Sequence, residues 1–178
     1  LVQTVTARND SEESAPWGTG PHPYLVAGDT PLDEWMLELP AARVLTVTDD
    51  RLSPIDLAPV DQADPRRFDF RAPRTLGAVE IDHAFTGLTR DAQGTATVRV
   101  TDAAGRGVAM SWDAACPWVQ IHTADKPDPA ENRLGLAVEP MTCAPDAFND
   151  ARYPFDTGLQ MIDPGQASTA SWRIAAIA

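Results

Sequence analysis

The sequence predicts an antiparallel all-β domain, either a sandwich or a barrel. Short runs rich in β-branched and aromatic residues recur along the chain, and clusters of turn-forming residues separate them. The 178 residues include 16 prolines and 11 glycines, which oppose long helices. Many short strands without helical periodicity between them are typical of this fold class.

The strand signal begins with residues 2–8, VQTVTAR, in which β-branched residues recur along the segment. One short segment, residues 31–36, suggests a helical turn. Residues 49–69 are rich in Asp, Pro and Arg, and we expect a long solvated connection there, with a binding loop as the alternative. The remaining predicted strands are residues 43–48, 79–85, 95–101, 108–112, 118–123, 134–139 and 168–177.

Size and charge limit the possible functions. A chain of 178 residues can form one domain with a sizeable core, so we expect a single domain over residues 1–178. The net charge of -12 argues against nucleic acids and anionic membranes as partners, because both need a basic surface. The chain has neither a long apolar segment nor the features of a signal peptide, so a cytoplasmic location is expected. The pairing of Cys116 and Cys143 stays open.

Glu139 stands out because it is an ionisable residue in an otherwise apolar strand, within GLAVEPMTCAPDAFN. Burying a carboxylate is costly unless it is paired, hydrogen-bonded or facing a wet cleft. Period-two alternation places it on one face with Gly135 and Ala137, whose small side chains would leave room for a ligand, while Leu136 and Val138 face the core. A local ion pair is the alternative explanation.

Two other predicted strands carry polar faces. In residues 79–85, alternation separates Ile81, His83 and Phe85 from the face that carries Asp82, which is the polar one. In residues 118–123, Trp118, Gln120 and His122 share one face, which combines an aromatic ring with two hydrogen-bonding side chains. Carbohydrate sites commonly have this composition. Cross-strand packing of Trp118 is the alternative and the commoner use of such a residue.

His22 lies in WGTGPHPYL, where glycines and prolines stiffen an irregular segment. Histidine, with an unperturbed pKa of about 6.5, is suited to exchanging protons at neutral pH. The sequence contains no nucleophile elbow, no phosphate-binding glycine loop and no cluster with metal-ligand spacing. Acid/base chemistry by a carboxylate and an imidazole, with no cofactor or metal, is therefore the remaining candidate.

Four ordered segments together resemble the aldose 1-epimerase (galactose mutarotase) family: GPHPYL at His22, EIDHAFTGL at Asp82, PWVQIHTAD at Gln120 and GLAVEPMTCAPDAFN at Glu139. The closing GLQMIDPGQASTASWRI is similar to the final segment of the family. The resemblance implies a galactose mutarotase-like antiparallel β-sandwich. It further implies that Glu139 is the catalytic base, His22 the catalytic acid and Asp82 a sugar-binding residue, with Gln120 and His122 lining the cleft.

The implied activity is the interconversion of the α and β anomers of a free hexose such as glucose or galactose. The alternatives are a hexose-6-phosphate 1-epimerase, for which Arg66, Arg67, Arg71 and Arg74 are candidates, and a non-catalytic carbohydrate-binding module. The resemblance covers rather more than the C-terminal half of a typical member. We therefore expect that this chain is the C-terminal part of the sandwich and that the N-terminal part of the same protein, which would supply further strands and sugar contacts, is its partner.

Overall fold

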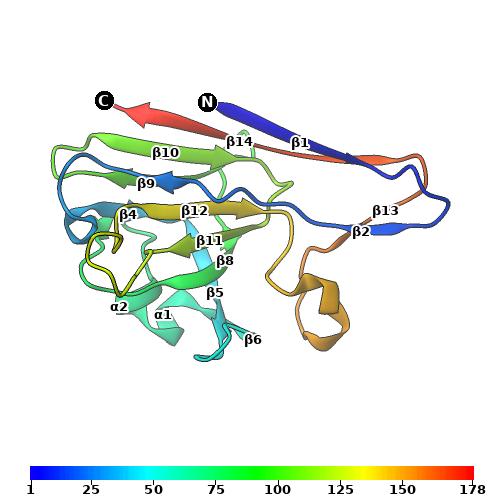
Figure 1. Ribbon diagram of the computed structural model, residues 1–178, viewed down its shortest axis with the longest axis horizontal. Helices are drawn as coiled ribbons and strands as arrows, with labels where there is room; N and C mark the ends of the chain where they lie inside the picture. The colour runs from blue at the N-terminus through cyan, green and yellow to red at the C-terminus, as the bar shows by residue number, and fades with distance from the viewer.

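The computed structural model describes residues 1–178 and contains two six-stranded sheets, in which all paired strands are antiparallel (Figure 1). The long β1 and β14 lie at one side of the first sheet, and the two ends of the chain lie close together there (Figure 1). The strands of this sheet, in spatial order, are β1 (Val2–Arg8), β14 (Ala167–Ile177), β10 (Gly107–Trp112), β9 (Ala96–Thr101), β4 (Met36–Glu38) and β7 (Arg74–Thr75).

The second sheet forms the other layer of the sandwich and carries most of the polar residues singled out above. Its central strands β12, β11 and β8 are neighbours although they are far apart in the sequence. The strands, in spatial order, are β3 (Tyr24–Leu25), β12 (Leu136–Met141), β11 (Trp118–His122), β8 (Asp82–Leu88), β5 (Ala41–Val47) and β6 (Pro54–Pro59).

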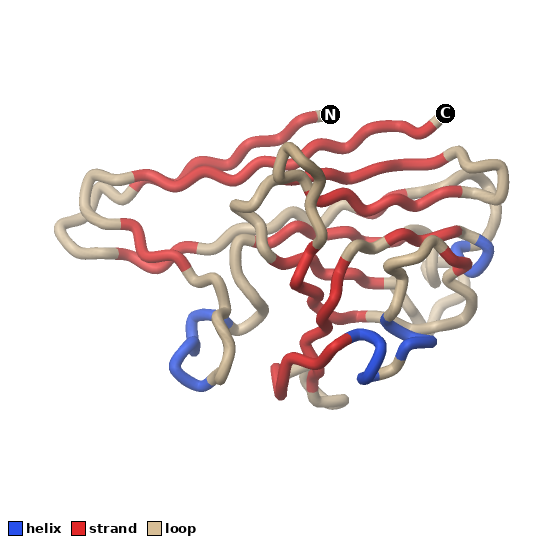
Figure 2. The backbone as a smooth tube through the Cα atoms, turned by 180° about the vertical axis from the view of Figure 1, so that it is seen from behind, coloured by secondary structure: helices blue, strands red, loops and turns tan.

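A small additional sheet projects from one end of the sandwich, together with a helical segment (Figure 2). It consists of β2 (Ala15–Trp17) and β13 (Gln160–Ile162). The helical segments are short: η1 (Leu32–Glu34), α1 (Val60–Ala63), α2 (Pro65–Phe68) and, in the projecting part, η2 (Ala147–Arg152). None of the helices is long and apolar enough to cross a membrane.

A core of 26 buried residues lies between the two sheets. The first sheet contributes side chains such as Met110 and Trp172, and the second contributes Phe85 and Ile121. Each large apolar side chain removed from water stabilises the fold by about 1.5–3 kcal/mol. The alternation predicted for residues 79–85 is confirmed, because the side chains of Ile81, His83 and Phe85 are buried.

A second, smaller apolar cluster lies on the opposite face of the second sheet. Trp118, only 2% exposed, packs there with Leu45 and Ala84, and the ring of Phe155 lies 6.1 Å from it. Trp118 is therefore a packing residue rather than an open platform for a sugar ring. The alternative given for it in the sequence interpretation is the correct one.

Most predicted strands are present, with shifts at their ends. Residues 2–8 form β1 as expected, and strand signals at 95–101, 108–112, 118–123 and 168–177 correspond to β9, β10, β11 and β14. The prediction for residues 79–85 began too early, because β8 starts at Asp82 and continues to Leu88. The expected helical turn near residues 31–36 is the 3-10 helix η1.

The expected solvated connection at residues 49–69 is wrong. This segment contains β6, which pairs with β5, followed by α1 and α2. Asp64 caps α2 by accepting hydrogen bonds from the backbone of Arg66 and Arg67, and Val60 and Phe68 are buried in the core. The alternating apolar residues were too few among Asp and Pro to reveal an edge strand from sequence alone. Cys116 and Cys143 are both free thiols.

His83 predicts an acid sensitivity of the fold. Burial lowers the pKa of His83 to about 4, and Arg67 acts in the same direction. Because the unfolded chain binds a proton near pH 6.5 and the folded chain does not, the free energy of unfolding should fall as the pH drops from 6.5 toward 4. Denaturant titrations of wild type and His83→Leu measure this, and the difference between them should change over that interval. Parallel curves would contradict the prediction.

Candidate active site

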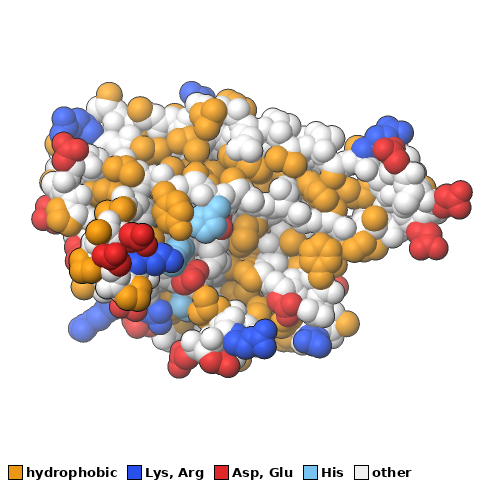
Figure 3. Space-filling view, viewed as in Figure 1, with side chains coloured by type: hydrophobic (Ala, Val, Ile, Leu, Met, Phe, Trp, Pro, Cys, Tyr) orange, Lys and Arg blue, Asp and Glu red, His pale blue; other side chains and the backbone are white.

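Three neighbouring strands place the predicted site residues on one face of the second sheet. Gln120 of β11 lies opposite Glu139 of β12, and His122 lies opposite Asp82 of β8. His22 comes from the irregular segment before β3, whose Tyr24 pairs with β12. The face viewed in Figure 3 presents histidine side chains near its middle, next to acidic and apolar ones. The structure thus brings together all five residues, although they come from four separate segments.

The segment that carries His22 is held against β12 by close backbone contact. The carbonyl of Thr19 accepts a hydrogen bond from the Thr142 amide at 3.0 Å, and the carbonyl of Pro23 accepts one from the Val138 amide at 3.3 Å. A Cβ atom on Gly20 would lie 2.9 Å from Cγ of Met141, so only glycine allows this approach. The glycine and proline pattern therefore fixes where His22 stands.

His22 and Glu139 form the central pair of the site. Nε2 of His22 lies 3.3 Å from Oε1 of Glu139. The imidazole is half-exposed, with 55% of its side chain accessible, whereas the carboxylate is 14% accessible. The ring of Tyr24 packs against His22 with centroids 5.0 Å apart, and His122 approaches it edge-on at 6.5 Å. Neighbouring rings and a carboxylate therefore orient the imidazole, while one side stays open to solvent.

Burial makes Glu139 a stronger base than an exposed glutamate. Desolvation raises the pKa of Glu139 above its ordinary value of 4.5, and nearby Asp82 adds to this, while His22 opposes it. A carboxylate with a raised pKa accepts a proton more readily, as general-base catalysis requires. A carboxyl with a raised pKa in contact with a second titratable group is a candidate for an active site.

Asp82, Gln120 and His122 form a polar group beside this pair. Nε2 of Gln120 donates a hydrogen bond of 2.7 Å to Oδ1 of Asp82. Nδ1 of His122 lies 3.6 Å from Oδ2 of Asp82, which is too far for a hydrogen bond. Both Oε1 of Gln120 and Nδ1 of His122 are buried without any hydrogen-bond partner. Leaving a buried polar atom unpaired costs about 1–3 kcal/mol, so these two atoms can gain from pairing with water or with a polar ligand.

One part of the sequence interpretation of Glu139 is wrong. Gly135 and Ala137 do not leave room for a ligand. A Cβ atom on Gly135 would lie 3.1 Å from Cβ of Tyr24, and Ala137 is fully buried. These small residues instead allow the segment around β3 to pack closely against β12. The space they provide holds the element that carries His22.

Tyr24 was not identified as a site residue from the sequence. It lies two positions after His22 in an extended segment, so the two side chains project to the same side, which is the signal that could have indicated it. The structure brings together no group of three or more His, Cys, Asp or Glu side chains that could hold a metal ion.

Comparison with known proteins adds the fold family. Over 99% of its length the chain superimposes on the crystal structure of a putative aldose 1-epimerase from Escherichia coli K12, with a TM-score of 0.74 and 20% identity. A GalM/aldose epimerase homologue from C. elegans matches over 100% of the chain with a TM-score of 0.75 and 18% identity. The chain has the galactose mutarotase-like fold. The resemblance predicted from four sequence segments is therefore confirmed for the β-sandwich.

The relatives of this galactose mutarotase-like chain are longer than the chain itself. A galactose mutarotase-like protein from Clostridium acetobutylicum has a TM-score of 0.75 and 15% identity, and the match covers 99% of this chain but 52% of that one. In sequence, the uncharacterized protein YihR of Escherichia coli (strain K12) is 34% identical over 149 residues, which are 84% of this chain and 44% of that protein. The chain spans about half the length of the relatives it matches. No family model matches it.

Proposed function

We propose that this chain carries the acid/base pair of an aldose 1-epimerase, which interconverts the anomers of a free hexose. The observation that carries the proposal is the contact of 3.3 Å between Nε2 of His22 and Oε1 of Glu139, beside a polar group with unpaired buried atoms. The anomeric oxygen and the ring oxygen of a pyranose are bonded to the same carbon. An acid and a base that serve these two oxygens must therefore lie close together, as this pair does.

In the proposed reaction, Glu139 takes the proton of the anomeric hydroxyl while His22 protonates the ring oxygen. The bond between C1 and the ring oxygen then breaks, and the pyranose opens to the aldehyde. Rotation about the C1–C2 bond presents the other face of the aldehyde. Reclosure with both proton transfers reversed gives the other anomer and restores the anionic Glu139 and the protonated His22. The cycle is balanced and uses only these two groups for proton transfer.

Asp82, Gln120 and His122 are the proposed contacts to sugar hydroxyls. A hydroxyl can donate one hydrogen bond and accept others, so it can pair with Oε1 of Gln120 and with Nδ1 of His122, the two atoms that lack partners. Residues outside this chain would complete the sugar site, since the relatives are about twice as long. We propose the N-terminal part of the same protein as their source.

Neither alternative gains support from the geometry. A 6-phosphate would need free arginine donors at the site, but three of the four candidate arginines already donate to other groups: Arg71 to Asp69, Arg67 to the Glu80 carbonyl and Arg74 to the Asp69 carbonyl. A simple carbohydrate-binding module requires no contact between an imidazole and a carboxylate with a raised pKa. The proposed aldose 1-epimerase activity on a free hexose needs no arginine cluster and does require the contact between His22 and Glu139.

Polarimetry tests the proposal directly. Freshly dissolved α-D-glucose or α-D-galactose should reach anomeric equilibrium faster with the protein than in buffer alone. The protein should accelerate the equilibration of glucose 6-phosphate less than that of the free sugars. Comparable acceleration of the 6-phosphate would support the phosphate-specific alternative. Sugar binding seen by calorimetry without any acceleration would instead support a binding module and remove the proposed activity.

A further inference from the structure

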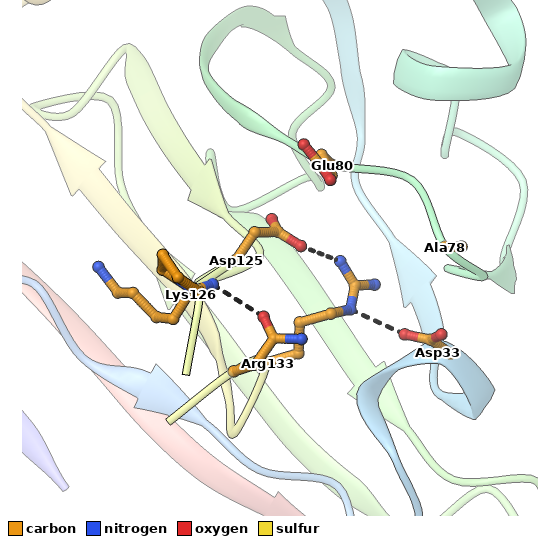
Figure 4. A pocket seen from close by; sticks show the side chains of 8 residues that line it. Asp33, Ala78, Glu80, Asp125, Lys126 and Arg133 are labelled. Carbon is orange, nitrogen blue, oxygen red and sulfur yellow. Dashed lines mark hydrogen bonds and ion pairs between the residues drawn. The ribbon is translucent and has the colours of Figure 1, made fainter. Parts of the chain in front are cut away.

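Arg133 joins the segments that precede and follow the polar part of the site (Figure 4). It lies just before β12, and its side chain is only 12% exposed. Nε donates to Oδ1 of Asp33 at 2.8 Å, and Nη1 donates to Oδ1 of Asp125 at 2.6 Å. Nη1 and Nη2 also donate to the carbonyls of Val79 and Gly77, at 3.2 and 2.8 Å. One guanidinium thus holds the segment before β8, the loop after β11 and η1 together.

A short chain of hydrogen bonds leads from Arg133 to the sugar-binding residues. The other carboxylate oxygen of Asp125 accepts from the hydroxyl of Thr123, which is fully buried. Oγ1 of Thr123 in turn accepts from the backbone amide of Ile81 at 2.9 Å. Thr123 directly follows His122, and Ile81 directly precedes Asp82. This series of hydrogen bonds therefore ends at the backbone next to Asp82 and next to His122, the two residues whose side chains lie 3.6 Å apart.

The loop between β11 and β12 has a conformation that needs such support. Ala124 and Arg133 both have positive φ angles, of 56° and 54°, although neither is glycine. The Arg133 amide donates to the Ala124 carbonyl at 3.0 Å, which closes the loop between them. Non-glycine residues in this region persist where the surrounding structure fixes them. The two ion pairs and two carbonyl contacts of Arg133 supply that restraint.

We propose that Arg133 is a positioning residue that sets the spacing of Asp82 and His122 through Asp125 and Thr123, and so determines how tightly the sugar is bound. This inference rests on the proposed function for its kinetic consequence. The series of hydrogen bonds that starts at Arg133 does not extend to His22 or Glu139. Its loss should therefore affect binding of the sugar hydroxyls more than proton transfer.

The charge state of Asp125 supports the same arrangement. Burial would raise the pKa of this carboxyl, but the hydrogen bond from Thr123 and the ion pair with Arg133 together hold it below its ordinary value. Asp125 is therefore an anion at neutral pH. It can accept from the arginine and from the threonine at the same time.

The test compares Arg133→Ala with Arg90→Ala as a matched control. Arg90 is also partly buried and donates to three carbonyls, those of Gly94, Trp112 and Cys116, at 3.2, 3.2 and 2.9 Å. Its partners lie before β9, at the end of β10 and just before β11, and none of them adjoins Asp82 or His122 in the sequence. In Arg133→Ala, KM for the hexose should rise about tenfold with kcat within about twofold of wild type, as loss of one charge-assisted hydrogen bond predicts. In Arg90→Ala, KM should not change.

A spectroscopic measurement gives a result that does not depend on activity. The side-chain amide of Gln120 donates to Asp82, so its NMR resonances should shift in Arg133→Ala and stay in place in Arg90→Ala. Thr123→Val keeps the shape of the side chain and removes the bridging hydroxyl, so it should also shift the Gln120 resonances. It serves as the test variant if Arg133→Ala does not fold. An inactive wild type would end the proposed function, and the Gln120 signal would still decide the positioning role.

Three outcomes would overturn the inference. In the first, Arg133→Ala and Thr123→Val leave both KM and the Gln120 resonances as in wild type. In the second, Arg90→Ala changes them as much as Arg133→Ala does, which would mean that general loosening of the fold is the cause. In the third, Arg133→Ala lowers kcat about tenfold and leaves KM unchanged, which would place Arg133 in proton transfer rather than in binding.

Discussion

Replacing Glu139 by Gln is expected to lower the catalysed rate of anomer interconversion by about 10²–10⁴-fold, the usual contribution of a general base. Glutamine keeps the size of the side chain and its ability to accept a hydrogen bond, but it cannot take the anomeric proton. Polarimetry with α-D-glucose, corrected for the spontaneous reaction, measures the loss. A variant that retains near wild-type rate would show that Glu139 is not the base.

Glu38→Gln is the matched control for this prediction. Glu38 lies on β4 of the other sheet and pairs with Arg99 at 3.0 Å, with 30% of its side chain exposed. Partly exposed ion pairs contribute about 0–1 kcal/mol, so the control should keep full activity and almost unchanged stability. A similar loss of rate in both variants would point to a general effect of removing a carboxylate.

Stability separates a chemical defect from an unfolded variant. The raised pKa of Glu139 means that the folded protein disfavours its anionic form. Below pH 4.5 the carboxyl is protonated in both states, and as the pH rises the unfolded state ionises first, so the cost to the folded state develops above that value. Glu139→Gln should therefore lose most of the catalysed rate yet be at least as stable as wild type at neutral pH. A strongly destabilised variant would contradict this account of the pKa.

Replacing His22 by Asn is expected to cost a similar factor, about 10²–10⁴-fold in rate, because asparagine cannot deliver a proton to the ring oxygen. The side chain is half-exposed and lies outside the core, so the fold should be unaffected. Since acid and base act in the same step, the double variant His22→Asn/Glu139→Gln should be about as slow as either single variant. Steady-state polarimetry of all four proteins measures this cycle.

Independent roles for the two residues would appear as multiplied losses. If the double variant lost rate by the product of the two single factors, His22 and Glu139 would act in separate steps. If His22→Asn alone kept its rate, the proton donor would be another group. His122, whose Nδ1 has no hydrogen-bond partner and lies 3.6 Å from Oδ2 of Asp82, would then be the next residue to replace.

The sequence itself was sufficient for the class of fold and for naming the five candidate residues that the structure brings together. The β-branched runs and the turn clusters between them specify strands locally, because backbone preference and alternation depend on neighbouring residues. Alternation also separated the two faces of β8 and of β11, with Asp82 on the polar face of one and Gln120 and His122 on a single face of the other. The strand pairing then shows that these side chains share a face with Glu139. The edge strand at residues 54–59 escaped notice because its prolines and Asp carry no regular pattern.

The tertiary structure alone decided the spatial relations that chemistry requires. That β8 lies beside β11, and that the His22 segment lies against β12, follows from packing of residues far apart in the sequence, which no local pattern encodes. The same packing fills the space beside Gly135 with Tyr24, which overturns the interpretation of that position as ligand surface. It also buries Trp118, which decides between a sugar platform and cross-strand packing in favour of packing. It also makes Arg133 the link between the strands that carry Asp82 and His122. Side-chain type is a property of the sequence, whereas the distance of 3.3 Å between the His22 imidazole and the Glu139 carboxylate arises only when the folded sandwich packs the segment before β3 against β12.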